Sequence, residues 1–193
     1  MADTPLIEAA RAWVIDKYPY NSHHLLKALE WVDKLAPDAS EAVRLATLTH
    51  DMERAFPGPD QPVHSVIKGF DDAEYNAAHS ARSARIVGSW LREQGADEAL
   101  MQEVERLISV HEDGGWHEAN LVQAADSLSF LETNIDLFLN MVRTGKRTMD
   151  EVLVKLDYTI ERIQIAEARV MGLPMYEAAK ARFQALAEET EQS

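Results

Sequence analysis

The sequence predicts an all-α protein. Apolar side chains recur at the spacing of helical turns over most of the 193 residues, and no long stretch alternates with the two-residue period of a β-strand. Candidate caps and proline or glycine breaks separate these stretches. The length fits one domain better than two, and a 46% share of hydrophobic residues can form a core. We therefore predict a single domain over residues 1–193, folded as a helical bundle.

Caps and prolines delimit the first expected helices. In chain order, the expected helices cover about residues 5–17, 22–36, 38–52, 73–94, 97–112, 121–142, 148–172 and 174–190. Thr4 is the expected cap of the first helix, and Pro5 is favoured at its first position. The second helix ends before Pro37, which cannot continue it. Asp38 and Glu41 have the spacing of a capping box, which predicts the start of the third helix.

Glycines, a capping box and a proline delimit the later helices. Gly95 follows the fourth helix and Gly114 follows the fifth, as is common at helix C-termini. Thr148 and Glu151 have the spacing of a second capping box. Pro174 is expected to open the last helix, because proline is tolerated in a first turn.

The composition restricts the chemistry and the partners. The chain has no cysteine, so disulfides, thiolate metal sites and cysteine nucleophiles are excluded, and histidines and carboxylates remain as the strong metal ligands. The net charge of −14 repels phosphate backbones and anionic lipids, so we expect no nucleic-acid partner and no membrane partner. We also expect neither a signal peptide nor a membrane span, which favours a cytoplasmic protein.

Four polar residues on successive expected helices are candidate metal ligands: His24, His50, Asp51 and Asp126. Several of them interrupt an apolar helical face, where an unpaired polar group is costly. Neighbouring helical residues diverge by about 100°. His50 and Asp51 therefore reach one ion best at a helix C-terminus, where the carbonyl groups also favour a cation. Such a set suits one or two divalent ions of Mn, Fe, Ni, Co or Zn better than calcium, and an ion with open positions activates water near neutral pH.

The order His, His-Asp, Asp resembles that of the HD superfamily of metal-dependent phosphohydrolases. The resemblance covers about residues 20–135, and the stretch 45–51 is the best match. His24 fits the first ligand better than its neighbour His23, because a basic and then an apolar residue follow it at the spacing usual in the family. The resemblance implies an HD-type bundle with the metal site between central helices, on which the helices of residues 148–190 pack.

The resemblance also implies a second ion, because family members with two metals carry extra histidines between the His-Asp pair and the final Asp. Asp51 would bridge two sets of ligands. The first set is His24, His50 and Asp126, and the second is His79 and His111. The alternative is that His79 and His111 are core histidines, or that they orient the ligands without binding a metal themselves. The other histidines are interpreted as surface or loop residues: His23, His64 and His117.

Fewer residues are candidates for handling a substrate. Arg82 lies one turn after His79, so its guanidinium could hold a phosphate or carboxylate group, with pairing to a protein carboxylate as the alternative. Glu53 could accept a proton, orient a ligand or form a solvated ion pair. Asp51 could accept a proton as well as position the ions. Lys155 is a weaker candidate.

With the resemblance, the sequence predicts a metal-dependent hydrolase that attacks a nucleotide or other small phosphate ester through a metal-activated water. The GYP signature of the cyclic-dinucleotide branch and the adjacent acids of the alarmone hydrolases are not found. A di-iron oxygenase of the same fold, acting on a small polar substrate, is the first alternative. A non-catalytic module that binds a small ligand is the second. We retain a homodimer as a hypothesis.

Overall fold

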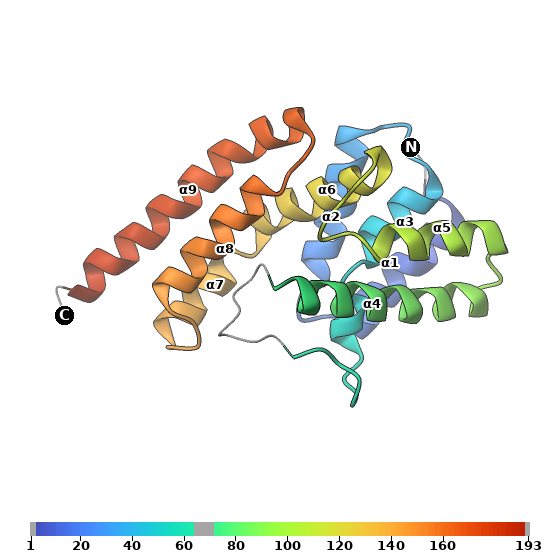
Figure 1. Cartoon of the computed structure of the whole chain (residues 1–193), viewed down its shortest axis with the longest axis horizontal. Helices are drawn as coiled ribbons and strands as arrows, with labels where there is room; N and C mark the ends of the chain where they lie inside the picture. Colours follow the sequence, from blue (N-terminus) through green and yellow to red (C-terminus); the bar gives the residue numbers. More distant parts are fainter. Residues whose placement is uncertain (1–2, 64–71, 192–193) are drawn as a thin grey trace.

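The computed structural model describes residues 3–63 and 72–191, and over these residues the chain is helical, without a strand (Figure 1). The prediction of an all-α fold is confirmed. The elements are α1 (Pro5–Lys17), α2 (Ser22–Leu35), α3 (Glu41–Thr49), the short 3₁₀ helix η1 (Met52–Ala55), α4 (Ala73–Glu93), α5 (Glu98–Ile108), α6 (His117–Thr133), α7 (Ile135–Arg143), α8 (Met149–Glu161) and α9 (Ala166–Glu191).

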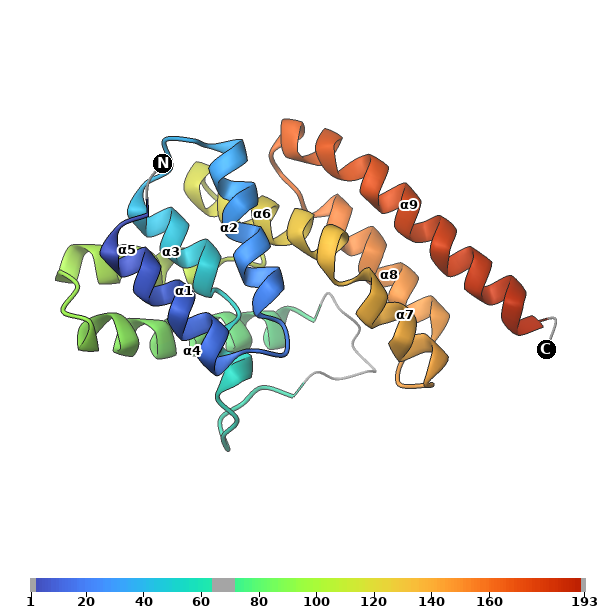
Figure 2. The same ribbon diagram turned by 180° about the vertical axis from the view of Figure 1, so that it is seen from behind.

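Helix α6 lies between two groups of helices. In Figures 1 and 2, α1–α5 lie on one side of α6, and α7–α9 lie on the other. Each group has its own apolar core, and α6 contributes to both, through Val122 and Ala125 on one face and through Ala124 and Leu128 on the other. Residues 121–131 of α6 are all buried. A helix that is buried all round can carry polar residues only where they are paired.

Several helix starts follow the predicted capping. Thr4 caps α1 by accepting the Ile7 N–H, with Pro5 at the first position. Thr148 and Glu151 form the predicted capping box of α8. The prediction for α3 was wrong, because Ser40 is the cap and accepts the Val43 N–H.

Helix ends inside the bundle differ from the prediction. Helix α5 ends at Ile108, and turns carry the chain through Glu112. The single helix expected over 121–142 is interrupted at Asn134, which separates α6 from α7. The helix expected over 148–172 ends at Glu161, where the chain turns so that Arg162 reaches groups on α6. These turns place polar groups against neighbouring helices, and a periodic pattern of apolar residues does not encode them.

The expectation that Pro174 opens the last helix was wrong. Helix α9 begins at Ala166 and continues through this proline. Gly172 lies where α9 passes α6 and α8, and a Cβ atom there would be 2.8 Å from Ile160 Cδ1 and 3.1 Å from Leu128 Cδ2. Because Gly172 has no side chain, α9 can pack closely on α6 and α8. This packing supports a continuous α9, although Pro174 removes one helical N–H.

No helix in the part of the chain that the structure describes has the length and apolar character needed to cross a bilayer.

Candidate metal centre

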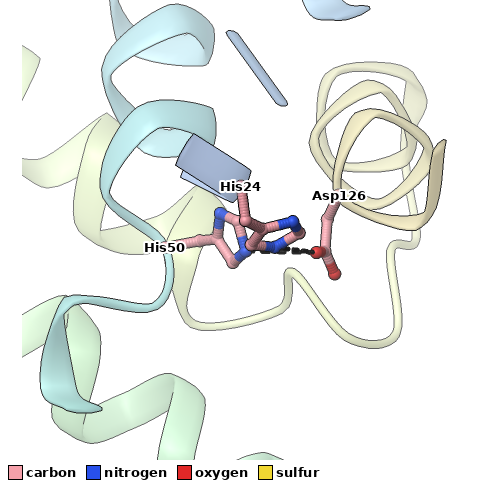
Figure 3. A group of neighbouring side chains, drawn as sticks. All are labelled: His24, His50 and Asp126. Carbon is pink, nitrogen blue, oxygen red and sulfur yellow. Dashed lines mark ion pairs between the residues drawn. The ribbon is translucent and has the colours of Figure 1, made fainter. Parts of the chain in front are cut away.

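Three side chains from three helices form the first cluster (Figure 3). His24 lies on the first turn of α2, His50 follows the last residue of α3, and Asp126 lies in the middle of α6. The Nε2 atoms of the two histidines are 3.0 and 3.2 Å from Asp126 Oδ1. Two imidazole nitrogens and a carboxylate oxygen therefore lie within 4.8 Å of one another, a spacing that can hold a metal ion.

Both imidazoles of this cluster are oriented through Nδ1. Ser129 donates its hydroxyl hydrogen to the His24 carbonyl at 2.7 Å, so its Oγ accepts from His24 Nδ1–H at 2.9 Å. His50 Nδ1 lies 2.8 Å from the Thr47 carbonyl, which can only accept. In the neutral rings Nδ1 therefore carries the hydrogen, and the Nε2 lone pair faces the centre. Metal-binding histidines are held in this way by their other nitrogen.

His79 and His111 form a second group beside the first. The ring centre of His111 is 4.9 Å from that of His50 and 5.2 Å from that of His79. His111 Nδ1 lies 2.8 Å from the Ile108 carbonyl, and His79 Nδ1 lies 2.9 Å from Glu53 Oε1. Because both acceptors contact Nδ1, the Nε2 atoms of the two rings face the centre. The structure thus brings together the histidines of the two predicted ligand sets.

The buried nitrogens of these rings fit a bound metal. Among the described residues, the Nε2 atoms of His50, His79 and His111 are buried without a hydrogen bond of acceptable geometry. Leaving a buried acceptor unsatisfied costs about 1–3 kcal/mol, and three occur in one place. A divalent cation would satisfy them, and a donor set of imidazoles and carboxylates suits Mn, Fe, Co, Ni or Zn.

Asp51 lies between the two groups. Its Oδ1 is 2.9 Å from His79 Nε2, and its Oδ2 accepts from Arg54 Nε at 3.0 Å. It can also share an ion with His50 and His111. Burial alone would raise the pKa of Asp51, but Arg54, His79 and His50 together outweigh burial and hold the pKa well below its usual range. An ionised carboxylate in this position is compatible with the predicted bridging role.

The electrostatics of the centre favour a positive charge at His50 and disfavour one at His111. Burial would lower the pKa of His50, but the Asp126 carboxylate outweighs it and raises the pKa to about 9. At His111, burial and the charge on His50 lower the pKa to about 4. The carboxylates thus attract a positive charge here, whether it is a proton on His50 or a metal ion that replaces the proton.

Glu53 and Arg82 lie behind the second group. Arg82 Nη1 donates to Glu53 Oε2 at 3.0 Å, and Arg82 Nη2 donates to the Phe56 carbonyl at 2.6 Å. The guanidinium thus holds Glu53, which in turn orients His79. Of the interpretations open from the sequence, this geometry favours an orienting role for Glu53 and carboxylate pairing for Arg82. A direct catalytic role of either residue stays a prediction.

Two residues of the centre, Glu112 and Arg162, were missed by the sequence reasoning. Arg162 follows α8, donates to Ser127 Oγ at 2.9 Å, and pairs with both Asp126 Oδ2 and Glu112 Oε2. Burial would raise the pKa of Asp126, but Arg162, His50 and His24 together outweigh burial and keep the pKa well below its usual range. No sequence pattern marked either residue as part of the centre. Glu112 was expected at the end of one helix and Arg162 inside another, whereas those helices end at Ile108 and Glu161.

A cavity of about 250 Å³ adjoins the centre. His24, Asp51, Glu112 and Asp126 line it on the side of the clusters. The remainder is lined by residues of the α1–α2 connection and by cationic, aromatic and apolar side chains of η1, α4 and the segment from α6 to α8. Among these are Tyr18, Tyr20, Arg54, Tyr75, Phe130, Leu137, Phe138, Met141, Arg147 and Lys155. The weaker candidate Lys155 therefore lies at the cavity, with its Nζ 5.5 Å from the Phe130 ring centre and 5.1 Å from that of Tyr158.

The remaining histidines lie in different surroundings. His23 is exposed on α2. His117 is exposed as the first residue of α6. His64 lies outside the described residues.

Comparison with known proteins identifies one matching family. The sequence model of a family described as a domain of unknown function (DUF4202) matches residues 5–182. No curated protein and no solved structure matches the chain.

Proposed function

The chain belongs to the DUF4202 family, and from its candidate metal centre we propose that it is a metal-dependent hydrolase of a small phosphate ester. One observation carries the proposal. Four buried imidazoles, each anchored through Nδ1, present Nε2 to a centre with two ionised carboxylates, and a cavity lined by cationic side chains adjoins that centre. The resemblance of the His, His-Asp, Asp order to HD phosphohydrolases supports the same reaction.

The residues of the centre would act by holding and orienting. His24, His50 and Asp126 would hold one ion, and Asp51 would stand between it and a second ion at His79 and His111. When bound, such an ion supplies a Lewis acid and an activated water. Asp51 would accept a proton from that water, in addition to positioning the ions.

The cavity side chains would bind the ester. Arg54, Arg147 and Lys155 offer positive charge for a phosphoryl group in a protein whose net charge is −14. A volume of about 250 Å³ is below the range of about 300–1,000 Å³ usual for ligand pockets. The substrate we propose is therefore a compact phosphate monoester, with an organic part that contacts Phe130, Leu137 and Met141.

The test combines metal content with activity. Mass spectrometry of untagged protein should find one or two ions of Mn, Fe, Co, Ni or Zn per chain, and a panel of phosphate monoesters should be assayed with each metal added. Replacing His50 and Asp51 by alanine should remove the metal and lower turnover by orders of magnitude while helical content by circular dichroism persists. Failure to bind any added metal, or undiminished turnover in the variant, would overturn the proposal.

A di-iron oxygenase is the second candidate, because the six predicted ligands lie together and include only nitrogen and oxygen donors. Iron content and the absorption spectrum of fresh protein separate the two reactions. Near two irons per chain, with oxygen consumption on a small polar substrate and no ester hydrolysis, would favour the oxygenase.

A further inference from the structure

We propose that Glu112 is a metal ligand that completes, with His79 and His111, a second cation site. The inference rests on the metal centre of the proposed function, but it does not depend on which reaction the centre catalyses. It adds a carboxylate to the two histidines, which the resemblance alone paired only with Asp51.

The donor atoms of this site already converge. One ligand atom each from His79, His111 and Glu112 lies within 4.8 Å of the others, and Glu112 Oε1 is 3.8 Å from His111 Nε2. Both histidines are fully buried, and within the described ranges their Nε2 atoms make no hydrogen bond of acceptable geometry. Two buried acceptors beside a carboxylate form a set that a borderline divalent cation would satisfy.

Two contacts fix the position of Glu112. It lies in the turn after α5, and its carbonyl accepts from Gln123 Nε2 at 3.2 Å. Its Oε2 pairs with Arg162, so that Oε1 remains on the side of His111. Arg162 also pairs with Asp126 of the first cluster. One guanidinium therefore positions a carboxylate of each cluster, which makes Arg162 a positioning residue for both.

A purely structural role would make Glu112 only the counter-ion of Arg162. The two roles differ in what a conservative change does. Replacement by Asp keeps the charge for Arg162 but withdraws the carboxylate by one methylene, and replacement by Gln keeps the shape but removes the charge. A counter-ion tolerates Asp better than Gln, whereas a ligand of a fixed site loses affinity in both variants.

The experiment is a titration of metal-free full-length protein with Mn²⁺, followed by calorimetry and by electron paramagnetic resonance, which detects coupling between two Mn²⁺ ions. The variants are Glu112→Gln and Glu112→Asp, and the matched control is Asp113→Asn at the exposed neighbouring position. Wild type and the control should bind two ions per chain. The Glu112 variants should bind the second ion more than about 10-fold more weakly, and the coupled signal should disappear. Even the loss of a residue that only hydrogen-bonds a ligand lowers metal affinity by about 10-fold or more.

Each outcome decides a different claim. Unchanged affinity for the second ion in the Asp variant would overturn the role of Glu112 as a ligand, whatever the Gln variant does, and one ion in wild type would overturn the second site. No bound ion in wild type would overturn the proposed function itself. Circular dichroism establishes that each variant is folded, and if the Gln variant does not fold, the Asp variant decides the question.

Discussion

Single acceptor groups determine what the histidines of the centre can do. The four rings are held by four different partners: a serine hydroxyl, two backbone carbonyls and a carboxylate. Of these four, the serine and the carboxylate can be removed by substitution, and a further hydroxyl, Ser80 Oγ, lies 3.2 Å from His111 Nδ1. The serine, Ser129 on α6, is also the one that ties His24 to the helix carrying Asp126.

Substitution of Ser129 by Ala should weaken metal binding without loss of the fold. His24 Nδ1–H would lose its acceptor, and the ring would no longer be held with Nε2 toward Asp126. We expect the affinity for the first metal ion to fall by about 10–100-fold, with a loss of about 1–2 kcal/mol in the free energy of unfolding from the lost hydrogen bonds. Metal titration and chemical denaturation measure the two effects.

The control is Thr133→Ala, one turn further along the same helix. The Thr133 hydroxyl donates to the Ser129 carbonyl at 2.7 Å, so the variant also loses a bond between hydroxyl and carbonyl. It should show a similar small loss of stability and unchanged metal affinity. Equal affinities for metal in the two variants would contradict the orienting role of Ser129.

The candidate ligands could be predicted from the sequence because their order and their placement on apolar helices are local features. His24, His50 and Asp126 do converge. Glu112 and Arg162 could not be found, because their pairing depends on where α5 and α8 end and how the chain turns there. Sequence spacing within one helix left open whether Arg82 holds a substrate or pairs with a carboxylate, and it could not identify Glu53 as a partner, because Glu53 comes from a different element.

At the scale of elements, the loop from α5 to α6 joins the two clusters. It carries Glu112 and includes Gly114, whose φ of 72° favours glycine. The Asn120 side chain at the start of α6 accepts the Gly115 N–H at 2.8 Å, so the loop is fixed to the helix that carries Asp126. A Cβ atom on Gly114 would be 2.4 Å from Asn120 Oδ1 and 2.8 Å from Gln164 Nε2.

Gly114→Ala should therefore destabilise the protein more than Gly95→Ala. Both glycines have positive φ, which costs an L-residue about 1–2 kcal/mol. At Gly95 no described heavy atom lies within 4 Å of the added Cβ, so only this conformational cost applies. At Gly114 the displaced side chains should add about 1 kcal/mol or more. Thermal and denaturant unfolding give the difference, and equal losses would show that the loop adapts without strain.

Prediction of the elements succeeded where side chains within four residues determine the outcome. The Thr148 and Glu151 capping box is an example, since both hydrogen bonds form within one turn. Prediction was wrong where packing decides. Asn134 and Arg162 end helices without a glycine or proline, and α9 passes through Pro174 because its neighbours support it.

At the scale of the whole molecule, the two groups of helices contribute different groups to the site. The helices α2–α5 supply the histidines, and α7 and α8 with their connection supply Arg147, Lys155 and Arg162. Helix α6, buried on all sides, carries Asp126 between them. In a protein whose net charge is −14, the cavity has three cationic side chains, Arg54, Arg147 and Lys155, beside its three carboxylates. The composition therefore describes the surface as a whole and does not describe this cavity.

Binding of inorganic phosphate tests whether the second group of helices supplies an anion site. Lys155→Met removes a positive charge from the cavity and keeps an apolar stem of similar length, so phosphate should bind to the metal-loaded protein about 10-fold more weakly, which corresponds to about 1.4 kcal/mol. Lys180→Met is the control, because Lys180 lies on α9 with its Nζ 3.0 Å from Tyr176 Oη. Both variants should retain the metal content of wild type, since neither lysine is a proposed ligand. Equal phosphate affinity in both variants would show that the metal ions alone attract the anion, and the helices after α6 would then serve the centre only through Arg162.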